Sequence, residues 1–139
     1  CVMRPLMCDM ERPLLSTTKR GTNKFESLDY NAHYCFPDIE PRYDGPDTVF
    51  IFEHPGTGNV NIQLHAPCGE LDLIALRWQD WTSEGTCPTA ETLSVTCDDS
   101  TDEGDDTVLL YEASPKEYLI IVDGPDGERS NFTLFAECP

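Results

Sequence analysis

The sequence predicts an all-β protein, an antiparallel β-sandwich of about seven to nine strands that is stapled by disulfides. Three observations predict it. Eleven prolines and nine glycines divide the 139 residues into short segments. Most of these segments alternate apolar and polar residues with the two-residue period of strands, not with the helical period. Seven cysteines without a zinc-type spacing indicate disulfide bonds.

Residues 58–65 give the clearest strand, with Val60, Ile62 and Leu64 on one face and polar side chains on the other. Residues 47–54 and 71–78 carry apolar side chains on both faces, which is typical of central strands or of a covered strand end. The loop from His54 to Asn59 contains two glycines that can adopt positive φ. We therefore expect a hairpin between the first two strands.

Four more strands are expected at residues 93–97, 107–112, 117–123 and 130–137, with a turn at 124–127 between the last two. Prolines are frequent before residue 47 and favour an extended arm with edge strands near 14–18 and 27–34. The chain is thus divided into an extended N-terminal arm, residues 1–20, and a single sandwich domain, residues 21–139.

Composition excludes several classes of partner and places the protein outside the reducing cytosol. Nine Lys and Arg against 26 Asp and Glu give a net charge of −17, which repels phosphate backbones, so no nucleic acid partner is expected. No apolar run approaches the roughly 18 residues of a membrane-spanning helix, so no transmembrane segment is expected. The cysteines indicate a secreted, extracellular or cell-surface protein. Cys1 as the first residue fits removal of a signal peptide, with lipidation of Cys1 as the alternative.

The order of the segments resembles bacterial pre-peptidase C-terminal (PPC) domains over residues 35–138. The first half of the resemblance consists of Cys35 and the runs 45–52, 58–64 and 71–76; the second consists of Cys87, Cys97 with the acidic pair that follows it, and the runs 116–124 and 130–135. The shared order carries the resemblance, because no single motif is specific. Cys1 and Cys68 have no counterpart in the pattern, and the catalytic domain that usually accompanies such domains is not part of this sequence.

The resemblance implies a jelly-roll-like sandwich, secretion, and non-catalytic work such as binding, folding support or adhesion, sometimes with calcium. We find no nucleophile elbow, metalloprotease helix motif or phosphate-binding loop, so the protein is not expected to be an enzyme.

The strand order suggests how the cysteines pair. Cys87 and Cys97 flank a short connection and are expected to close it, while Cys8 and Cys35 are expected to tie the arm to the sandwich. Of the remaining three, we favour Cys68 with Cys138, which leaves Cys1 as the candidate intermolecular thiol. Each bridge is expected to contribute about 2–4 kcal/mol by restricting the unfolded chain.

An acidic run is a candidate calcium site. Calcium takes about six to eight oxygen ligands, and the run offers carboxylates at Asp98, Asp99, Asp102, Asp105 and Asp106. The spacing is not that of an EF-hand, and a solvated acidic loop is the alternative.

The sequence offers three other kinds of candidate site: an aromatic platform for a ligand, a glycosylation site, and pairs of His and Cys that could bind a metal. Trp78 and Trp81 are a candidate platform for a sugar or a protein, with core packing as the alternative. Asn131 begins an N-glycosylation sequon and is expected on the face opposite Phe132. His33 with Cys35, and His65 with Cys68, have short metal-ligand spacings, but disulfide pairing explains these cysteines better.

Two functions follow from these residues. The first is a self-associating structural subunit of an extracellular fibre or surface layer, whose apolar segment 1–8 adds a strand to the sheet edge of a neighbouring copy. The alternative is an extracellular carbohydrate- or protein-binding adhesion module that uses the tryptophan pair or the acidic run.

Overall fold

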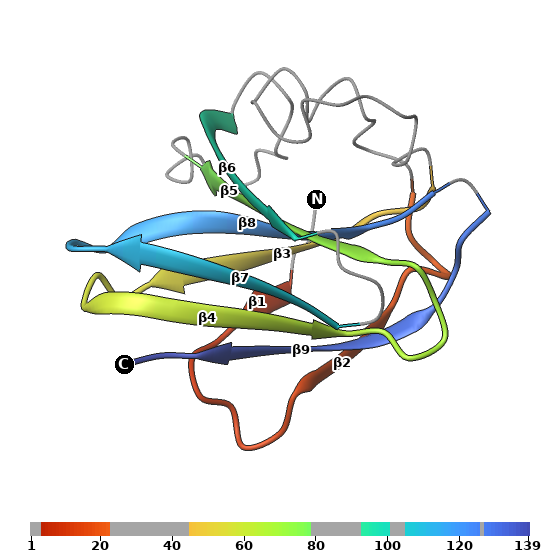
Figure 1. The fold of residues 1–139 in the computed structure, drawn as a ribbon, viewed down its shortest axis with the longest axis horizontal. Helices are drawn as coiled ribbons and strands as arrows, with labels where there is room; N and C mark the ends of the chain where they lie inside the picture. The colour runs from red at the N-terminus through yellow and green to blue at the C-terminus, as the bar shows by residue number, and fades with distance from the viewer. Residues whose placement is uncertain (1–3, 23–44, 79–92, 101–104, 126) are drawn as a thin grey trace.

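The computed structural model describes residues 4–22, 45–78, 93–100, 105–125 and 127–139, with the backbone alone for 93–100. The chain forms two packed β-sheets (Figure 1), one with strand order β1-β3-β8-β5-β6 and the other with order β2-β9-β4-β7. The strands are β1 (Arg4–Leu6), β2 (Leu14–Thr17), β3 (Thr48–His54), β4 (Gly58–His65), β5 (Asp72–Trp78), β6 (Leu93–Ser100), β7 (Asp105–Glu112), β8 (Lys116–Asp123) and β9 (Asn131–Glu137). The predicted disulfide-containing β-sandwich is confirmed.

The core lies between the two sheets and is built by alternate side chains. Strand β4 directs Val60, Ile62 and Leu64 inward, as its alternating sequence predicts. Across the interface, the rings of Phe50 on β3 and Phe132 on β9 meet edge to face, with centroids 6.1 Å apart. Strands β3 and β5 are interior strands of the five-stranded sheet, as their two apolar faces predict.

The predicted hairpin between β3 and β4 is wrong. The two strands belong to different sheets, so the loop crosses from one layer to the other. Its glycines do adopt positive φ, 74° at Gly56 and 123° at Gly58. A Cβ atom at Gly56 would lie 2.2 Å from the carbonyl carbon of Ser114, so the crossing requires glycine there.

The N-terminal segment is built into the sandwich and is not a separate arm. Strand β1 pairs in parallel with β3 of the same chain, and Leu6 is buried. Strand β2 is an edge strand that pairs with β9, close to the predicted position. Residues 4–6 therefore occupy their own sheet edge, contrary to their expected pairing with a neighbouring copy. The edge strand predicted at 27–34 lies outside the described residues.

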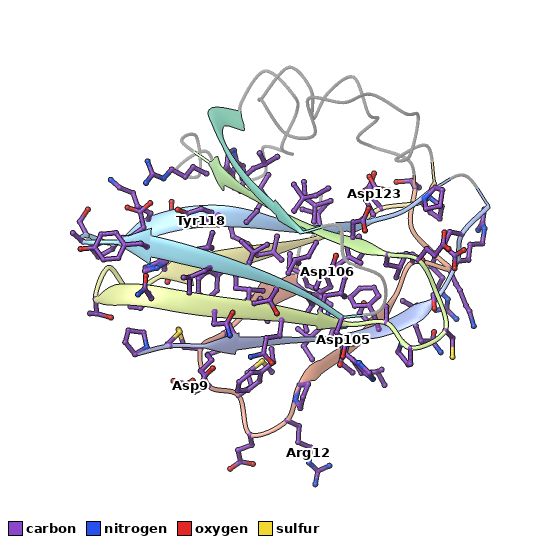
Figure 2. All side chains as sticks on the ribbon, viewed as in Figure 1. Asp9, Arg12, Asp105, Asp106, Tyr118 and Asp123 are labelled. Atoms are coloured by element: carbon purple, nitrogen blue, oxygen red, sulfur yellow. A yellow bond between two sulfur atoms is a disulfide. The ribbon has the colours of Figure 1, made fainter. Side chains whose placement is uncertain are left out.

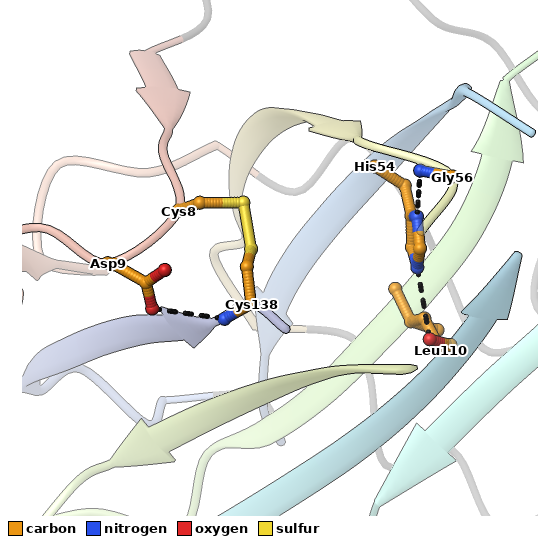
Figure 3. Close-up of a disulfide and its surroundings, with 6 residues drawn as sticks. All are labelled: Cys8, Asp9, His54, Gly56, Leu110 and Cys138. Atoms are coloured by element: carbon orange, nitrogen blue, oxygen red, sulfur yellow. Dashed lines mark hydrogen bonds between the residues drawn. A yellow bond between two sulfur atoms is a disulfide. The ribbon is translucent and has the colours of Figure 1, made fainter. Parts of the chain in front are cut away.

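A disulfide joins Cys8 to Cys138, with the two Cα atoms 5.5 Å apart (Figure 3). Beside it, the Cys138 amide donates to the Asp9 carboxylate at 3.0 Å, and the Asp9 amide donates to the carbonyl of Ala136 at 2.8 Å. The bond ties the segment after β1 to the end of β9, and thus one sheet to the other.

This disulfide corrects the predicted pairing. Both Cys8 with Cys35 and Cys68 with Cys138 are wrong, because Cys8 and Cys138 bond to each other and Cys68 is an exposed free thiol. The order of strands is the reason: β1 and β9 lie at neighbouring positions of the two layers, although their cysteines are 130 residues apart in sequence. Cys1, Cys35 and Cys87 and the side chain of Cys97 lie outside the described residues, and so does the predicted Cys87–Cys97 pair. In the described residues, no helix is long and apolar enough to cross a membrane.

Candidate functional site

The outward side of the four-stranded sheet is exposed, and we call it the open face. It is formed by the alternate side chains of β2, β9, β4 and β7 that point away from the core. These are Leu15, Thr17, Asn131, Thr133, Phe135, Glu137, Asn59, Asn61, Gln63, His65, Asp105, Thr107, Leu109 and Tyr111. The strands alternate because each has one side on the core and the other in water.

Amide side chains run along the middle of the open face. Asn59, Asn61 and Gln63 project from β4, which lies between β7 and β9. The strand register places Asn59 beside Tyr111 of β7 and Gln63 beside Phe135 of β9. Asn59 and Gln63 are exposed, whereas the Oδ1 atom of Asn61 is buried and has no hydrogen-bond partner in the described part of the chain. The centre of the face thus offers amide donors and acceptors between two aromatic rings.

The most exposed apolar side chains of the open face lie on its two edge strands. Leu109 and Tyr111 on the edge strand β7 are 61% and 66% exposed, and Leu15 on the edge strand β2 is 66% exposed. The face carries two carboxylates among its described residues, Glu137 and Asp105. Asp105 is paired with the ring of His65 on the neighbouring strand. This face is therefore poor in charge although the whole chain carries −17.

The inner side of β7 holds two buried acids, one at each end, that tie the sheets together. Asp106 lies at the start of β7, and Figure 2 shows Tyr118 displaced from it along the sandwich. The Asp106 carboxylate accepts a hydrogen bond from the amide of Leu73 on β5 at 3.1 Å. At the other end, Glu112 pairs with Arg77 of β5 and accepts a hydrogen bond from the Tyr118 hydroxyl at 2.7 Å.

The pKa values at this second end follow from these contacts. Burial opposes ionisation of Glu112, but the hydrogen bonds from Tyr118 and Arg77 and the charge of Arg77 lower its pKa below the ordinary 4.5. Burial is the largest cause that raises the pKa of Tyr118 to about 12. Both groups are thus held in the state that links the sheets, with Glu112 as carboxylate and Tyr118 as phenol.

His54 makes a further structural link between the layers. Its Nδ1 atom accepts from the Gly56 amide at 3.0 Å, and its Nε2 atom donates to the carbonyl of Leu110 on β7 at 3.1 Å (Figure 3). The ring is buried and both nitrogens are occupied, so His54 is a structural residue of the β3–β4 crossing.

A cleft of about 810 Å³ opens beside this link, lined by charged side chains of both signs. Arg77 and Lys116 supply the cations, and Glu53 and Glu117 the anions. Glu53 and Glu117 are directly opposite each other on β3 and β8. Burial, followed by the charge of Glu53, raises the pKa of Glu117 above its ordinary value. The mixture of signs does not select one class of ligand.

The predicted aromatic platform is wrong at Trp78, which is 5% exposed and buried in the sheet. Its strand, β5, is covered on both faces, and the two-sided apolar pattern of that strand already indicated burial. Trp81 lies outside the described residues. The aromatic residues that are available, Tyr111 and Phe135, were not singled out from the sequence, although alternation in the segment 107–112 places Tyr111 outward.

The candidate calcium ligands are not brought together in the described part of the chain. Asp105 and Asp106 are consecutive in β7, so their side chains point to opposite sides of the sheet, one exposed and one buried (Figure 2). Asp98 and Asp99 belong to β6, whose side chains are not described, and Asp102 lies outside the described residues. Asn131 is exposed on the open face as expected, and its glycosylation stays a prediction.

No family model matches this chain, and neither does any curated protein. Among solved structures, the fold is similar to that of CorA, a surface-associated copper-binding protein of Methylomicrobium album BG8. The TM-score is 0.55, and the superposition covers 99% of this chain and 98% of that chain. With 8% sequence identity, the similarity is one of fold.

Proposed function

We propose that this protein is a non-catalytic, secreted surface protein that binds a glycan chain on its open face. The observation that carries the proposal is the row of amides on β4 between the exposed ring of Tyr111 and the half-buried ring of Phe135.

The chemistry of the open face suits a sugar chain. A planar amide presents two donors and an acceptor together, which matches adjacent sugar hydroxyls. Aromatic rings offer a flat apolar surface on which the C–H side of a sugar ring can pack. Tyr111 is exposed and in register with Asn59, so stacking and hydrogen bonding are available side by side.

The arrangement of polarity favours a glycan over a protein partner. Protein interfaces have an apolar centre and a polar rim. Here the amides occupy the interior strand β4 and the most exposed apolar side chains, Leu109, Tyr111 and Leu15, lie on the edge strands, while the interior ring of Phe135 is half-buried. A narrow, hydroxyl-rich chain fits a polar centre with apolar flanks better than a second protein surface does.

A location outside the cell is supported by chemistry and by similarity of fold. The Cys8–Cys138 bond needs an oxidising compartment to form and persist. CorA, which shares the fold, is surface-associated, and PPC domains, to which the order of segments is similar, are secreted binding or adhesion modules. These likenesses support the proposed location and a non-catalytic role.

Copper binding, a property of CorA, is not part of the proposal. A copper site needs several ligands such as imidazole or thiolate close together. Both ring nitrogens of His54 are engaged by the backbone, and no group of three His, Cys, Asp or Glu side chains lies together in the described residues. The donor set that these residues offer does not fit the metal.

Binding to an array of neutral and anionic polysaccharides tests the proposal. We expect Tyr111→Ala and Asn59→Ala each to weaken binding about tenfold, as expected for an aromatic or amide side chain in direct contact with the ligand. Met7→Ala is the matched control, because Met7 is 61% exposed and lies away from the open face. Wild-type protein that binds no polysaccharide, or binding that both open-face variants retain, would overturn the proposal.

Self-association is a second candidate function, favoured by the exposed free thiol of Cys68. The sequence placed the intermolecular thiol at Cys1, whereas the described residues offer Cys68. In an oxidising compartment such a thiol can form a disulfide with a second copy. Non-reducing electrophoresis should then show a dimer that Cys68→Ser abolishes. A wild-type monomer under mild oxidation rejects this candidate.

A further inference from the structure

Three basic side chains gather where the open face ends, between β2 and β9. Lys19 and Arg20 follow β2, and Arg129 precedes β9. Backbone contacts hold these two segments together, since the amide of Thr18 donates to the carbonyl of Ser130 at 3.0 Å. The Arg129 guanidinium donates to the carbonyl of Lys19 at 3.4 Å. We call Lys19, Arg20 and Arg129 the basic corner.

The basic corner is not neutralised within the described part of the chain. All three side chains are exposed, and none forms an ion pair with a described acid. The nearby carboxylate of Glu128 is turned toward Gly69, where a Cβ atom would lie 2.8 Å from its Oε1 atom. In a chain of net charge −17, a cluster of uncompensated cations is a local reversal of sign.

The basic corner continues the open face. Thr17 and Asn131 are paired across β2 and β9 on that face, and Lys19 and Arg129 each lie two residues beyond one member of this pair. Tyr111 and Asn59 lie at the far end, where β4 begins and β7 ends. Since a strand advances roughly 3.4 Å per residue, Asn59 and His65 alone are separated by about 20 Å. A glycan that contacts Tyr111 and several amides can therefore reach the basic corner.

We propose that the glycan bound by the open face is anionic, and that the basic corner holds its carboxylate or sulfate groups. Arg and Lys recognise such oxyanions through charge-assisted hydrogen bonds. Because the rest of the protein repels polyanions, the corner also fixes the direction in which the chain lies across the sheet. This inference rests on the proposed glycan-binding function.

Two matched pairs of polymers test the inference with the full chain. Alginate is compared with carboxyl-reduced alginate, and dextran sulfate with dextran, so each pair differs in charge and the two pairs separate carboxylate from sulfate. Wild-type protein should bind one anionic polymer more tightly than its neutral counterpart, and added salt should weaken that binding because exposed charges are screened.

A charge variant and a matched control locate the effect. Lys19→Gln with Arg20→Gln should weaken binding of the anionic polymer about three- to tenfold and leave binding of the neutral polymer unchanged. Arg12→Gln with Lys116→Gln removes the same charge from exposed positions elsewhere and should have little effect.

The outcomes separate the two proposals. Equal binding of anionic and neutral polymers, or equal losses in the two double variants, overturns the inference and leaves glycan binding in place. Failure to bind any polymer overturns both. Weaker binding of both the anionic and the neutral polymer in Tyr111→Ala, with weaker binding of the anionic polymer alone in the Lys19 and Arg20 variant, supports both.

Discussion

The two sheets of the sandwich differ in how many of their faces are buried. In the five-stranded sheet, four side chains that point away from the other sheet are fully buried, namely Ile74, Leu76, Leu119 and Ile121. In the four-stranded sheet, Leu109 and Tyr111 occupy outward positions and are 61% and 66% exposed. Similar residue types therefore maintain the fold in one sheet and are available for recognition in the other.

The largest effect expected from this contrast is on stability. Ile121→Ala should lower the free energy of unfolding by about 2–5 kcal/mol, because it leaves a cavity in a fully packed region. Leu109→Ala should change it by less than about 0.5 kcal/mol, because the side chain is already in water. Urea denaturation of both variants measures the difference. Equal losses would mean that the outward sides of the two sheets are alike.

Removing the Cys8–Cys138 disulfide measures how much the covalent link between the two sheets contributes to stability. Cys8→Ala with Cys138→Ala should lower the free energy of unfolding by about 2–5 kcal/mol, since it removes the covalent restraint on the unfolded chain. Thermal unfolding under non-reducing conditions measures it. Cys68→Ser is the control and should unfold like the wild type, because that thiol is exposed and unbonded. A double variant as stable as the wild type would show that non-covalent contacts alone join the sheets.

Glu112 allows a further test of the comparison, because its charged carboxylate lies between the two sheets. Its pKa is lowered in the folded state from the ordinary 4.5, so it contributes stability above that pH, and the contribution is lost as the pH falls through the lowered value. Glu112→Gln should lower stability at neutral pH by about 1–3 kcal/mol and flatten the acid side of the stability profile. Denaturation at a series of pH values checks this. Glu137→Gln, an exposed change on the open face, should leave the profile unchanged.

The smallest expected effect on stability concerns Tyr118 and appears only at alkaline pH. Burial is the first cause that raises its pKa from 10.0 to about 12, so the stability it supports is present below pH 10 and is lost as the pH rises toward 12. Absorbance titration of the tyrosines should show a component near pH 12 that Tyr118→Phe removes. Tyr111→Phe, which alters an exposed ring, should leave that component in place. If the component near pH 12 remained in Tyr118→Phe, its assignment to Tyr118 would be wrong.

Local pattern predicted the strands well and their arrangement less well. Strand β4 was recognised with its full bounds, because alternation is a property of the strand itself. The pairing of β1 within its own chain was missed, because three residues with a central proline carry no such pattern and depend on the distant β3. The loop at Gly56 reverses the chain as predicted, but nothing in its glycines distinguishes a hairpin from a crossing between sheets.

The candidate site illustrates the same limit. The polar side chains of β4 were assigned to one exposed face from sequence, yet their neighbours Tyr111 and Phe135 come from strands that only the sheet order places beside them. The choice of Trp78 as a platform gave too little weight to its own strand, whose two-sided apolar pattern indicates burial. The pairing of Cys8 with Cys138 could not be derived from spacing, since it depends on which strands become neighbours.

The Cys8–Cys138 bond also determines how the protein carries mechanical load. The two cysteines enclose every strand from β2 to β9 in one covalent loop. If tension is applied between the segment before Cys8 and the residue after Cys138, the force passes through the sulfur bridge and bypasses the hydrogen bonds among β2 to β9, while the pairing of β1 with β3 lies outside the loop. The open face would then keep its shape under fluid shear until a covalent bond broke.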